Sequence, residues 1–187
     1  KLRRLVDIFF GLSVSLILLP LLIIVAIMIK FDSHGPVFFI SERIGLDNKK
    51  FKMFKFRTMF TNTEIIETSK IKNPNSKITK IGKILRKYSI DEVPQFLNLI
   101  LGNMTIVGPR PALPQQFKLI NNRKKFGIHK IKPGVTGYAQ VHGRDLITDS
   151  KKLKLEIEYI KNRSFYLDLK IILKTFIIVF SKKGVSH

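Results

Sequence analysis

"IFFGLSVSLILLPLLIIVAIMI", residues 8–29, contains no charged residue and constrains the fold more than any other stretch. A straight α-helix of these 22 residues would be about 33 Å long, enough to cross the roughly 30 Å hydrocarbon core of a bilayer. A secretory signal peptide has a shorter apolar region followed by a small-residue cleavage site, and no such site follows Ile29. The run therefore predicts a segment that stays associated with a membrane.

Pro20 stands in the middle of this run and is expected to interrupt the helix. Proline lacks the N–H that a helix needs, and its ring clashes with the preceding turn. Both flanks are basic, with Arg3 and Arg4 before the run and Lys30 after it, and basic flanks tend to stay on the cytoplasmic side. A re-entrant helix–break–helix, which enters and leaves by the same face, satisfies both observations. A kinked spanning helix stays open as the alternative, because prolines also occur in helices that cross membranes.

The chain is strongly basic, with 34 Lys and Arg against 13 Asp and Glu and a net charge of +21. This imbalance predicts an anionic partner, which could be nucleic acid, an anionic membrane surface or a phosphorylated substrate. A hydrophobic content of 45% excludes a disordered basic tail. The absence of cysteine excludes disulfides, zinc–thiolate sites and a thiol nucleophile, and the four scattered histidines match no metal-ligand spacing.

Beyond the turn "SHGP" at 33–36, helical and strand patterns alternate irregularly, which predicts a helix-rich α+β fold with a short sheet. We expect two domains, a membrane hairpin at 1–32 and a membrane-associated domain at 33–187. The first strand, at 37–40, is expected to be buried. The other expected elements are a strand at 51–59 and helices at 77–88, 89–101 and 150–162. A rigid extended segment is expected at 108–114, and loops are expected at 61–77 and 132–144.

The stretch "YLDLKIILKTFIIVF" at 166–180 predicts an amphipathic helix that lies in the membrane interface. Lys170 and Lys174 are four residues apart, so they share one face of that helix, while most of the other residues are apolar. An ordinary core helix remains the alternative, because the same pattern would also pack against a protein interior.

"SIDEVPQ", residues 89–95, places two carboxylates side by side in this basic chain. Ser89 to Glu92 matches the S-x-x-E capping box, in which the Ser and Glu side chains bind the first N–H groups of a helix. That structural role is one interpretation of the pair. Neighbouring helix residues point about 100° apart, so Asp91 and Glu92 would act separately if they are catalytic. One would then be a nucleophile, and the other would act on a metal ion or as an acid–base group.

Basic residues elsewhere in the chain favour the functional interpretation. Arg110 lies between two prolines, whose fixed φ angles restrict the backbone, and a restricted guanidinium suits bidentate phosphate binding. Arg144 ends a glycine-rich loop whose N–H groups could hold an anion. The other candidate phosphate-binding residues are Arg86 and the pair Lys55 and Arg57, which are expected to share one face of the strand at 51–59. Together they describe two carboxylates among phosphate-binding cations, beside a membrane segment.

Five segments carry a resemblance to a known family. They are "FKMFKFRTM", "GKILRKYSIDEVPQFLN", "LGNMTIVGPRP", "KPGVTGYAQVHGR" and "SFYLDLKI", and they follow one another in the order found in bacterial sugar transferases. The chain resembles this family over almost its whole length. It is most similar to the small monotopic phosphoglycosyl transferases, which include undecaprenyl-phosphate sugar-1-phosphate transferases.

The resemblance implies an enzyme that transfers sugar-1-phosphate from a UDP-sugar, expected to be N-acetylated, to undecaprenyl phosphate and releases UMP. It implies that Asp91 is the nucleophile and forms a covalent phosphosugar intermediate, that Glu92 with Asp91 holds Mg²⁺, and that the candidate cations bind phosphates. Mg²⁺ and fixed cations would offset the repulsion between a carboxylate and a phosphate.

The resemblance also implies a location. The catalytic domain would be monotopic, on the cytoplasmic face of the bacterial inner membrane, with a re-entrant helix broken at Pro20. Anionic phospholipids would then be a further partner, which agrees with the basic charge.

Other functions stay open from the residues alone. A glycosyltransferase that moves only the sugar would release UDP instead of UMP. A non-catalytic protein that binds membranes or nucleic acid would also fit the charge. A nucleic-acid partner is not expected, because the uncharged run does not suit one and no nucleic-acid-binding motif is present. The sequence leaves the sugar, the glycoconjugate pathway and the oligomeric state open.

Overall fold

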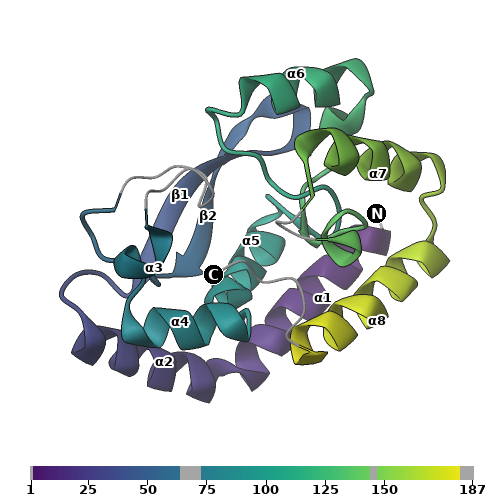
Figure 1. Cartoon of the computed structure of the whole chain (residues 1–187). Coiled ribbons are helices and arrows are strands. Elements are labelled where there is room, and N and C mark those ends of the chain that lie inside the picture. The colour runs from purple at the N-terminus through teal and green to yellow at the C-terminus, as the bar shows by residue number, and fades with distance from the viewer. Residues whose placement is uncertain (1, 64–72, 144–146, 182–187) are drawn as a thin grey trace. The chain divides into compact units, whose positions relative to one another are not determined.

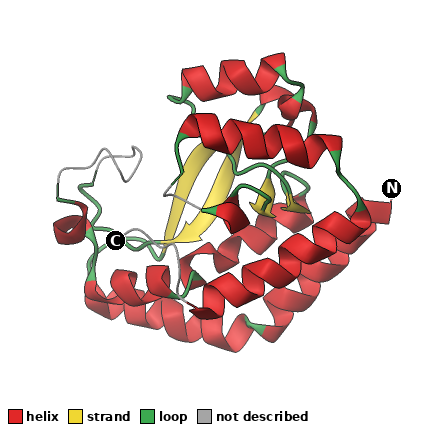
Figure 2. Cartoon of the chain, turned by 45° about the vertical axis from the view of Figure 1, so that its right-hand side comes forward, coloured by secondary structure: helices red, strands yellow, loops and turns green. Residues whose placement is uncertain are grey.

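The computed structural model describes residues 2–63, 73–143 and 147–181. Within these ranges helices predominate, and the strands form two small two-stranded sheets (Figure 2), so the predicted helix-rich α+β class is confirmed. The chain divides into two compact units. Unit 1 contains the described residues of 2–41 and 52–100, and unit 2 contains those of 42–51 and 101–181. The predicted domain boundary after residue 32 stays a prediction.

Two helices begin unit 1, α1 (Leu2–Ile17) and α2 (Leu19–Asp32), and they are bent by 62° relative to each other (Figure 1). Pro20 is the second residue of α2, where its missing N–H leaves the end of α1 without one helical hydrogen bond. Helical bonding resumes when the Leu22 N–H donates to the Leu18 carbonyl at 2.9 Å. The predicted helix–break–helix is therefore present, with the break at Leu18 rather than at the proline itself.

The lengths of these helices bear on the membrane prediction. Across the described part of the chain, no single helix is both long and apolar enough to cross a bilayer, whereas α1 and α2 reach that length and composition only as a bent pair. Apolar side chains of both helices are exposed, including Phe9 (74%), Ile17 (74%) and Phe31 (89%). Unit 1 therefore carries an exposed apolar surface along its bent helix pair.

A β-hairpin follows α2. Its strands β1 (Phe38–Ile44) and β2 (Lys50–Phe56) form a two-stranded sheet, and the turn between them contains the 3₁₀ helix η1 (Leu46–Asn48). Asp47 and Asn48 have positive φ angles of 53° and 59°. Asp and Asn adopt this left-handed conformation more readily than most other residues, which explains why the turn is built from them.

Two predictions in unit 1 need correction. The first strand is longer than predicted and is not buried, because Phe38 and Ile40 are about half exposed, at 46% and 49%. The predicted loop at 61–77 ends in a short helix, α3 (Pro74–Lys77), which begins at a proline suited to a first helical turn. Residues 64–72 of that loop lie outside the described residues.

The core of unit 1 lies where α2, β2 and α4 (Lys80–Lys87) meet, and α2 and α4 run side by side in Figure 1. α4 confirms the helix predicted at 77–88. Its first turn is capped by Thr79, whose hydroxyl accepts a hydrogen bond from the Gly82 N–H at 3.0 Å. The buried core side chains are Val25, Ile29, Phe56 and Leu85.

The helix predicted at 89–101 consists of two parts, a 3₁₀ helix η3 (Ile90–Gln95) and then α5 (Phe96–Leu101). Its extent is confirmed, but its first half is not α-helical. The guanidinium of Arg4 in α1 donates to the Leu99 carbonyl and, at 2.6 Å, to the Ile100 carbonyl. It thereby satisfies carbonyls at the end of α5 that have no helical partner, and it ties α1 to α5.

The sheet of unit 2 is formed by β3 (Thr105–Val107) and β4 (Gly134–Thr136), which run parallel with Thr105 opposite Gly134 and Val107 opposite Thr136. The sequence predicts neither strand, and it predicts a loop where β4 lies. The glycines of this segment suggest a loop, but Gly134 is required for a different reason. A Cβ at Gly134 would meet the backbone at Gly108. The glycines therefore permit close approach of two strands as well as turns.

Unit 2 also contains the helices α6 (Phe117–Lys125), α7 (Asp149–Lys161) and α8 (Phe165–Ser181). α8 packs against both strands of the sheet, and α6 packs against α7. α7 and α8 confirm the predicted helices at 150–162 and 166–180, and α6 is not predicted. Short 3₁₀ helices are found at η4 (Ile128–Lys130) and η5 (Gln140–His142). The buried core side chains of unit 2 include Val107, Tyr159 and Ile171.

α8 has one buried side and one exposed apolar side. Ile171 is 1% exposed in the core, whereas Leu173 (55%) and Ile177 (67%) are exposed. The ammonium of Lys170 lies 4.3 Å from the centre of the Tyr166 ring. The predicted amphipathic helix is therefore present, and its position in a membrane interface stays a prediction.

Candidate active site

Asp91 and Glu92 lie in the first turn of η3, and the chain enters this turn through Ser89 in a left-handed conformation (φ 56°, ψ 22°). Only two residues separate the end of α4 from η3, so the chain has to reverse sharply there. The predicted capping box is wrong, because Ser89 makes no side-chain cap hydrogen bond. A capping serine needs an extended backbone to aim its hydroxyl at the helix. A left-handed backbone does not aim the hydroxyl there. The main chain closes the turn instead, with the Glu92 N–H donating to the Ser89 carbonyl at 3.2 Å.

Both carboxylates are largely buried. Asp91 is 9% exposed. The Glu92 side chain is 17% exposed, and its Oε1 accepts a charge-assisted hydrogen bond from Lys55 Nζ at 2.7 Å. Lys55 comes from β2, so the structure brings one predicted phosphate-binding residue directly to the predicted metal ligand. A substrate-binding role for Lys55 stays a prediction.

Asn98 fixes the segment that carries Asp91 against β2, and sequence reasoning missed it. Its side-chain Oδ1 accepts from the Phe54 N–H at 3.1 Å, and its Nδ2 donates to the Lys52 carbonyl at 2.7 Å. Asn98 is completely buried, and a buried amide is stabilising only when its groups are paired. The available signal was a lone polar residue inside the apolar run "FLNLIL" of α5.

The prediction that Arg57 shares a strand face with Lys55 is wrong. β2 ends at Phe56, and the alternation of side chains between the two faces ends with it. Arg57 is 4% exposed and faces the turn after α2. It donates to the carbonyl of Ser33 at 2.7 Å, to the Ser33 hydroxyl at 3.1 Å, and to the carbonyl of His34. Burial lowers the pKa of Arg57, and the charge of Asp32 opposes that shift. The predicted role in phosphate binding is not tested by these contacts.

The remaining predicted cations are distributed over both units. Arg86 is partly buried in the last turn of α4, in unit 1. Arg110 follows β3 in unit 2 and lines a small pocket there, and Arg144 lies outside the described residues. Their binding roles stay predictions.

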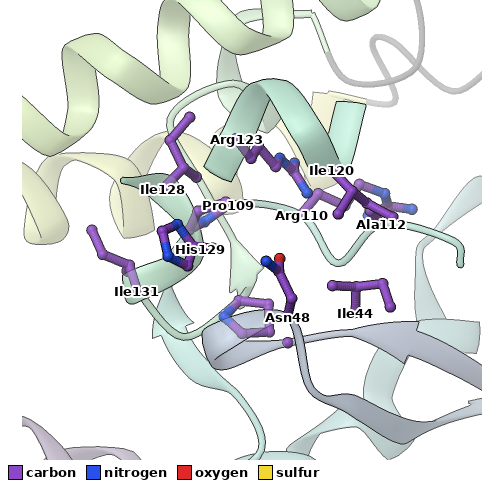
Figure 3. A pocket seen from close by; sticks show the side chains of 12 residues that line it. Ile44, Asn48, Pro109, Arg110, Ala112, Ile120, Arg123, Ile128, His129 and Ile131 are labelled. Carbon is purple, nitrogen blue, oxygen red and sulfur yellow. The ribbon is translucent and has the colours of Figure 1, made fainter. Parts of the chain in front are cut away.

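The pocket of unit 2 has mostly apolar walls (Figure 3). Arg123 lines it, but this guanidinium is committed to Glu156 through Nε, which donates to Oε2 at 2.8 Å, and through Nη2, which donates to Oε1. His129 also lines it, with a buried Nδ1 that has no hydrogen-bond partner among the described residues. Arg110 is the second arginine that lines the pocket. The pocket lining therefore combines two guanidinium groups and one imidazole with apolar side chains. The other lining residues are Ile44, Gly45, Asn48, Pro109, Ala112, Ile120, Ile128, Ile131 and Pro133.

A further polar cluster of unit 2 holds the predicted glycine-rich loop against α7 and α8. The Tyr138 hydroxyl donates to Glu158 at 2.8 Å, and this bond raises the pKa of Tyr138. His142 Nδ1 lies 2.7 Å from the Tyr138 carbonyl, and its Nε2 lies 3.3 Å from Lys174 Nζ. An ammonium can only donate, so Nε2 accepts and the proton lies on Nδ1. The sequence placed Lys174 with Lys170 on one face of an interfacial amphipathic helix and did not predict this cluster.

The chain is similar to known bacterial proteins over most of its length. Residues 1–182 match the family model described as bacterial sugar transferase. An undecaprenyl-phosphate glucose phosphotransferase of Komagataeibacter xylinus is 39% identical over 181 residues, which cover 89% of this chain and 34% of that protein. A UDP-N-acetylgalactosamine-undecaprenyl-phosphate N-acetylgalactosaminephosphotransferase of Aeromonas hydrophila is 38% identical, over 83% of this chain and 38% of that protein.

The chain thus spans little more than a third of these two relatives. It spans far more of an uncharacterized sugar transferase of Bacillus subtilis, EpsL, which is 39% identical over 160 residues that cover 86% of this chain and 78% of that protein. A family model that matches nearly the whole chain and a relative of similar length lead to the same conclusion. The chain belongs to the bacterial sugar transferase family.

Proposed function

We propose that this protein transfers sugar-1-phosphate from a UDP-sugar to undecaprenyl phosphate and releases UMP. The names of two relatives support this, since they describe undecaprenyl-phosphate phosphotransferases of glucose and of N-acetylgalactosamine. The observation that carries the proposal is a buried Asp91 next to Glu92, whose carboxylate is held by Lys55 at 2.7 Å. A carboxylate in basic surroundings suits nucleophilic attack on a phosphate, because the cations stabilise the charge of the transition state.

Asp91 is the proposed nucleophile. One of its carboxylate oxygens attacks the phosphorus that bears the sugar. The bond from that phosphorus to the oxygen shared with UMP breaks, and UMP leaves with the electron pair. The covalent product joins the sugar phosphate to Asp91. An oxygen of undecaprenyl phosphate then attacks the same phosphorus, and the Asp91 carboxylate leaves and is regenerated.

Glu92 and Asp91 are the residues that would hold Mg²⁺. The described ranges contain no group of three or more Asp, Glu, His or Cys that could form a metal site from protein ligands alone. The donors present fit the usual Mg²⁺ arrangement, in which one or two carboxylates bind the ion and substrate phosphates and water supply the other oxygens. Mg²⁺ bound there would neutralise charge on the diphosphate and on departing UMP.

The phosphates of the two substrates are proposed to bind Lys55, Arg86, Arg110 and Arg144. A guanidinium can donate two parallel hydrogen bonds to a phosphate, and an ammonium offers a compact charge. Arg86 belongs to the helix that leads directly into the Asp91 turn, which supports its role. Arg57 is the exception among the predicted cations, because both of its terminal nitrogens already bind backbone oxygens of Ser33 and His34.

The acceptor is a lipid, so the enzyme has to work at a membrane. The exposed apolar side chains of α1 and α2 support a re-entrant hairpin at residues 1–32 that enters and leaves by the same face. Residues 33–187 would then form a monotopic catalytic domain on the cytoplasmic face of the bacterial inner membrane. The net charge of +21 favours anionic phospholipids at that surface, and α8 would lie in the interface.

The identity of the transferred sugar is the most specific part of the proposal. An N-acetylated sugar is supported by the N-acetylgalactosamine relative, and glucose by the K. xylinus relative. A panel of donors therefore has to include UDP-glucose as well as UDP-N-acetylglucosamine and UDP-N-acetylgalactosamine.

Nucleotide release tests the proposal directly. Purified protein would be incubated with Mg²⁺, undecaprenyl phosphate and each UDP-sugar, with Asp91→Asn as the matched inactive variant. UMP from one or two sugars, absent with Asp91→Asn, is the expected result. UDP in place of UMP would establish a sugar-only transferase and overturn the mechanism. A covalent sugar phosphate detected by mass spectrometry on a peptide containing Asp91 would test the intermediate itself.

A further inference from the structure

The turn that follows α2 is built around a buried guanidinium. Three N–H groups of Arg57 are bound within the protein, by the Ser33 carbonyl at 2.7 Å, the Ser33 hydroxyl at 3.1 Å and the His34 carbonyl. Its Nε is buried and has no hydrogen-bond partner among the described residues. A guanidinium binds phosphate well when it can present two parallel N–H groups, and here both terminal nitrogens already bind protein oxygens.

Gly35 shows how closely this turn fits the guanidinium. Its φ of +121° lies in a region that glycine adopts far more readily than other residues. A Cβ at this position would meet Nη1 of Arg57. The chain therefore wraps around the end of Arg57 at a distance that only a glycine allows, which is typical of a permanent structural contact.

Asp32 connects the same turn to α4. Its Oδ2 accepts a hydrogen bond from the Ile81 N–H at 3.0 Å, in the first turn of α4, where the N–H groups have no helical partner. A negative charge is also favourable at the N-terminus of a helix. The last residue of α2 therefore caps α4, and Arg57 holds the residues that follow it.

α4 leads directly to Asp91. It ends at Lys87, and the Ser89 N–H donates to the Arg86 carbonyl at 3.1 Å as the chain turns into η3. Val25 of α2 and Leu85 of α4 share one buried core, and Ile90, the residue before Asp91, packs against it. A displacement of the α2 turn would thus be transmitted along α4 to Asp91.

We propose that Arg57, together with Asp32, is a positioning residue that fixes Asp91 through α4, and that Arg57 does not bind substrate phosphate. This inference rests on the proposed function, because it assigns Asp91 the nucleophilic role. Loss of either contact lets the α2 turn and the start of α4 move apart, and Asp91 no longer lies in line with the phosphorus. A misplacement of about 1 Å can lower a catalytic rate about a hundredfold.

Two variants of opposite charge test this assignment. Arg57→Gln removes a positive charge, and Asp32→Ala removes a negative one. If both residues position Asp91, both variants lower kcat for UMP release, by about ten- to a hundredfold, and leave KM for the UDP-sugar and the Kd of UDP unchanged. If Arg57 instead binds phosphate, Arg57→Gln weakens UDP binding, while Asp32→Ala leaves it unchanged or strengthens it. That second pattern would overturn the proposal.

Conservative variants and a control complete the design. Arg57→Lys keeps the charge but lacks the planar pair of nitrogens with which Arg57 binds Ser33 and His34. It should therefore share the kcat defect, and full rescue by lysine would contradict the positioning role. Asp32→Asn keeps an acceptor oxygen for the Ile81 N–H and should recover much of the activity that Asp32→Ala loses. Lys83→Gln removes an exposed cation of α4 and should change neither parameter.

The outcomes also separate this proposal from the proposed function. If the native protein releases no UMP from any UDP-sugar, the proposed function fails, and the Kd of UDP for the same variants still decides whether Arg57 binds phosphate. If Arg57→Gln does not fold, Arg57→Lys and Asp32→Ala decide by the same comparison of kcat with KM.

Discussion

Lys55 Nζ and Glu92 Oε1 lie 2.7 Å apart, with side chains only 15% and 17% exposed. The contact joins β2 to the 3₁₀ turn that also carries Asp91. A largely buried carboxylate is destabilising unless a partner compensates for its lost hydration, and here the ammonium does so. The pair therefore fixes the direction of Glu92 at the candidate active site, and it makes the two residues depend on each other.

Lys55→Met should show that this buried ion pair contributes more to activity and stability than an exposed ion pair does. We expect it to lower UMP release at least about tenfold and to reduce the free energy of unfolding by about 1–3 kcal/mol, because Glu92 loses its partner. Lys50→Met is the matched control, since Lys50 binds Glu42 at 3.1 Å with both side chains nearly 60% exposed. The control should change stability by no more than about 0.5 kcal/mol. Equal denaturation midpoints for the two variants would contradict a stabilising role for Lys55.

Asn98 should matter for stability because it replaces a strand partner at the edge of β2. Asn98→Ala leaves the Phe54 N–H and the Lys52 carbonyl without their side-chain partner, and we expect a loss of about 1–3 kcal/mol. Asn98→Asp keeps an acceptor for Phe54 but turns a carboxylate toward the Lys52 carbonyl, so it should be destabilising too. Asn162→Ala removes a similar bond at the exposed end of α7 and serves as control. Denaturant unfolding of the three variants measures the difference.

The sequence predicted what local patterns determine. Apolar residues at helical spacing predicted the ends of α4, α7 and α8 to within three residues. An amphipathic face is determined by residues that are close together in the sequence. The "SIDEVPQ" motif identified the segment with Asp91. Both predictions depend on residues close together in the chain.

Other features depend on partners far away in the chain. Ser89 matches a capping box, but the short connection after α4 forces it into the left-handed region. Asn98 acquires its role only when α5 meets β2, more than forty residues earlier in the chain. Arg57 departs from its predicted strand face because β2 ends one residue before it. β4 was missed because its glycine allows close strand contact, a property that also describes a loop.

Tyr159 should make stability depend on alkaline pH. Burial, and then its hydrogen bond to Asp168 at 2.7 Å, raise the pKa of Tyr159 far above its usual value of about 10. The folded state therefore keeps the proton where the unfolded chain loses it. The stabilisation is fully present below about pH 10 and is lost as the pH rises further toward the folded-state pKa.

Tyr159→Phe tests this dependence. The variant should lose about 1 kcal/mol at neutral pH through the missing hydrogen bonds, and its stability should fall less steeply above about pH 10. Tyr166→Phe, at a side chain that is 66% exposed, is the control and should leave the pH profile unchanged. Parallel profiles for Tyr159→Phe and the native protein would show that Tyr159 ionises normally.

The bend between α1 and α2 should survive the loss of Pro20, because packing at both ends holds it. Arg4 ties α1 to the end of α5, and Val25 and Ile29 hold α2 in the core of unit 1. Pro20→Ala restores one helical hydrogen bond but breaks neither contact. If the pair forms the proposed re-entrant hairpin, Pro20→Ala should keep both flanks on the same side of the membrane.

Cysteine labelling can measure this, since the chain has no cysteine of its own. Single cysteines in place of Lys1 and Lys30 should react with a membrane-impermeant reagent from the same face of sealed vesicles, in the native background and with Pro20→Ala. When Arg4→Ala is added to Pro20→Ala, α1 loses its hydrogen bonds to α5. Residues 2–32 can then form one straight helix of about 45 Å, since each residue adds about 1.5 Å. The two sites should then begin to label from opposite faces. Labelling from opposite faces in the native background would contradict the hairpin, and the same result with Pro20→Ala alone would mean that the proline fixes the bend.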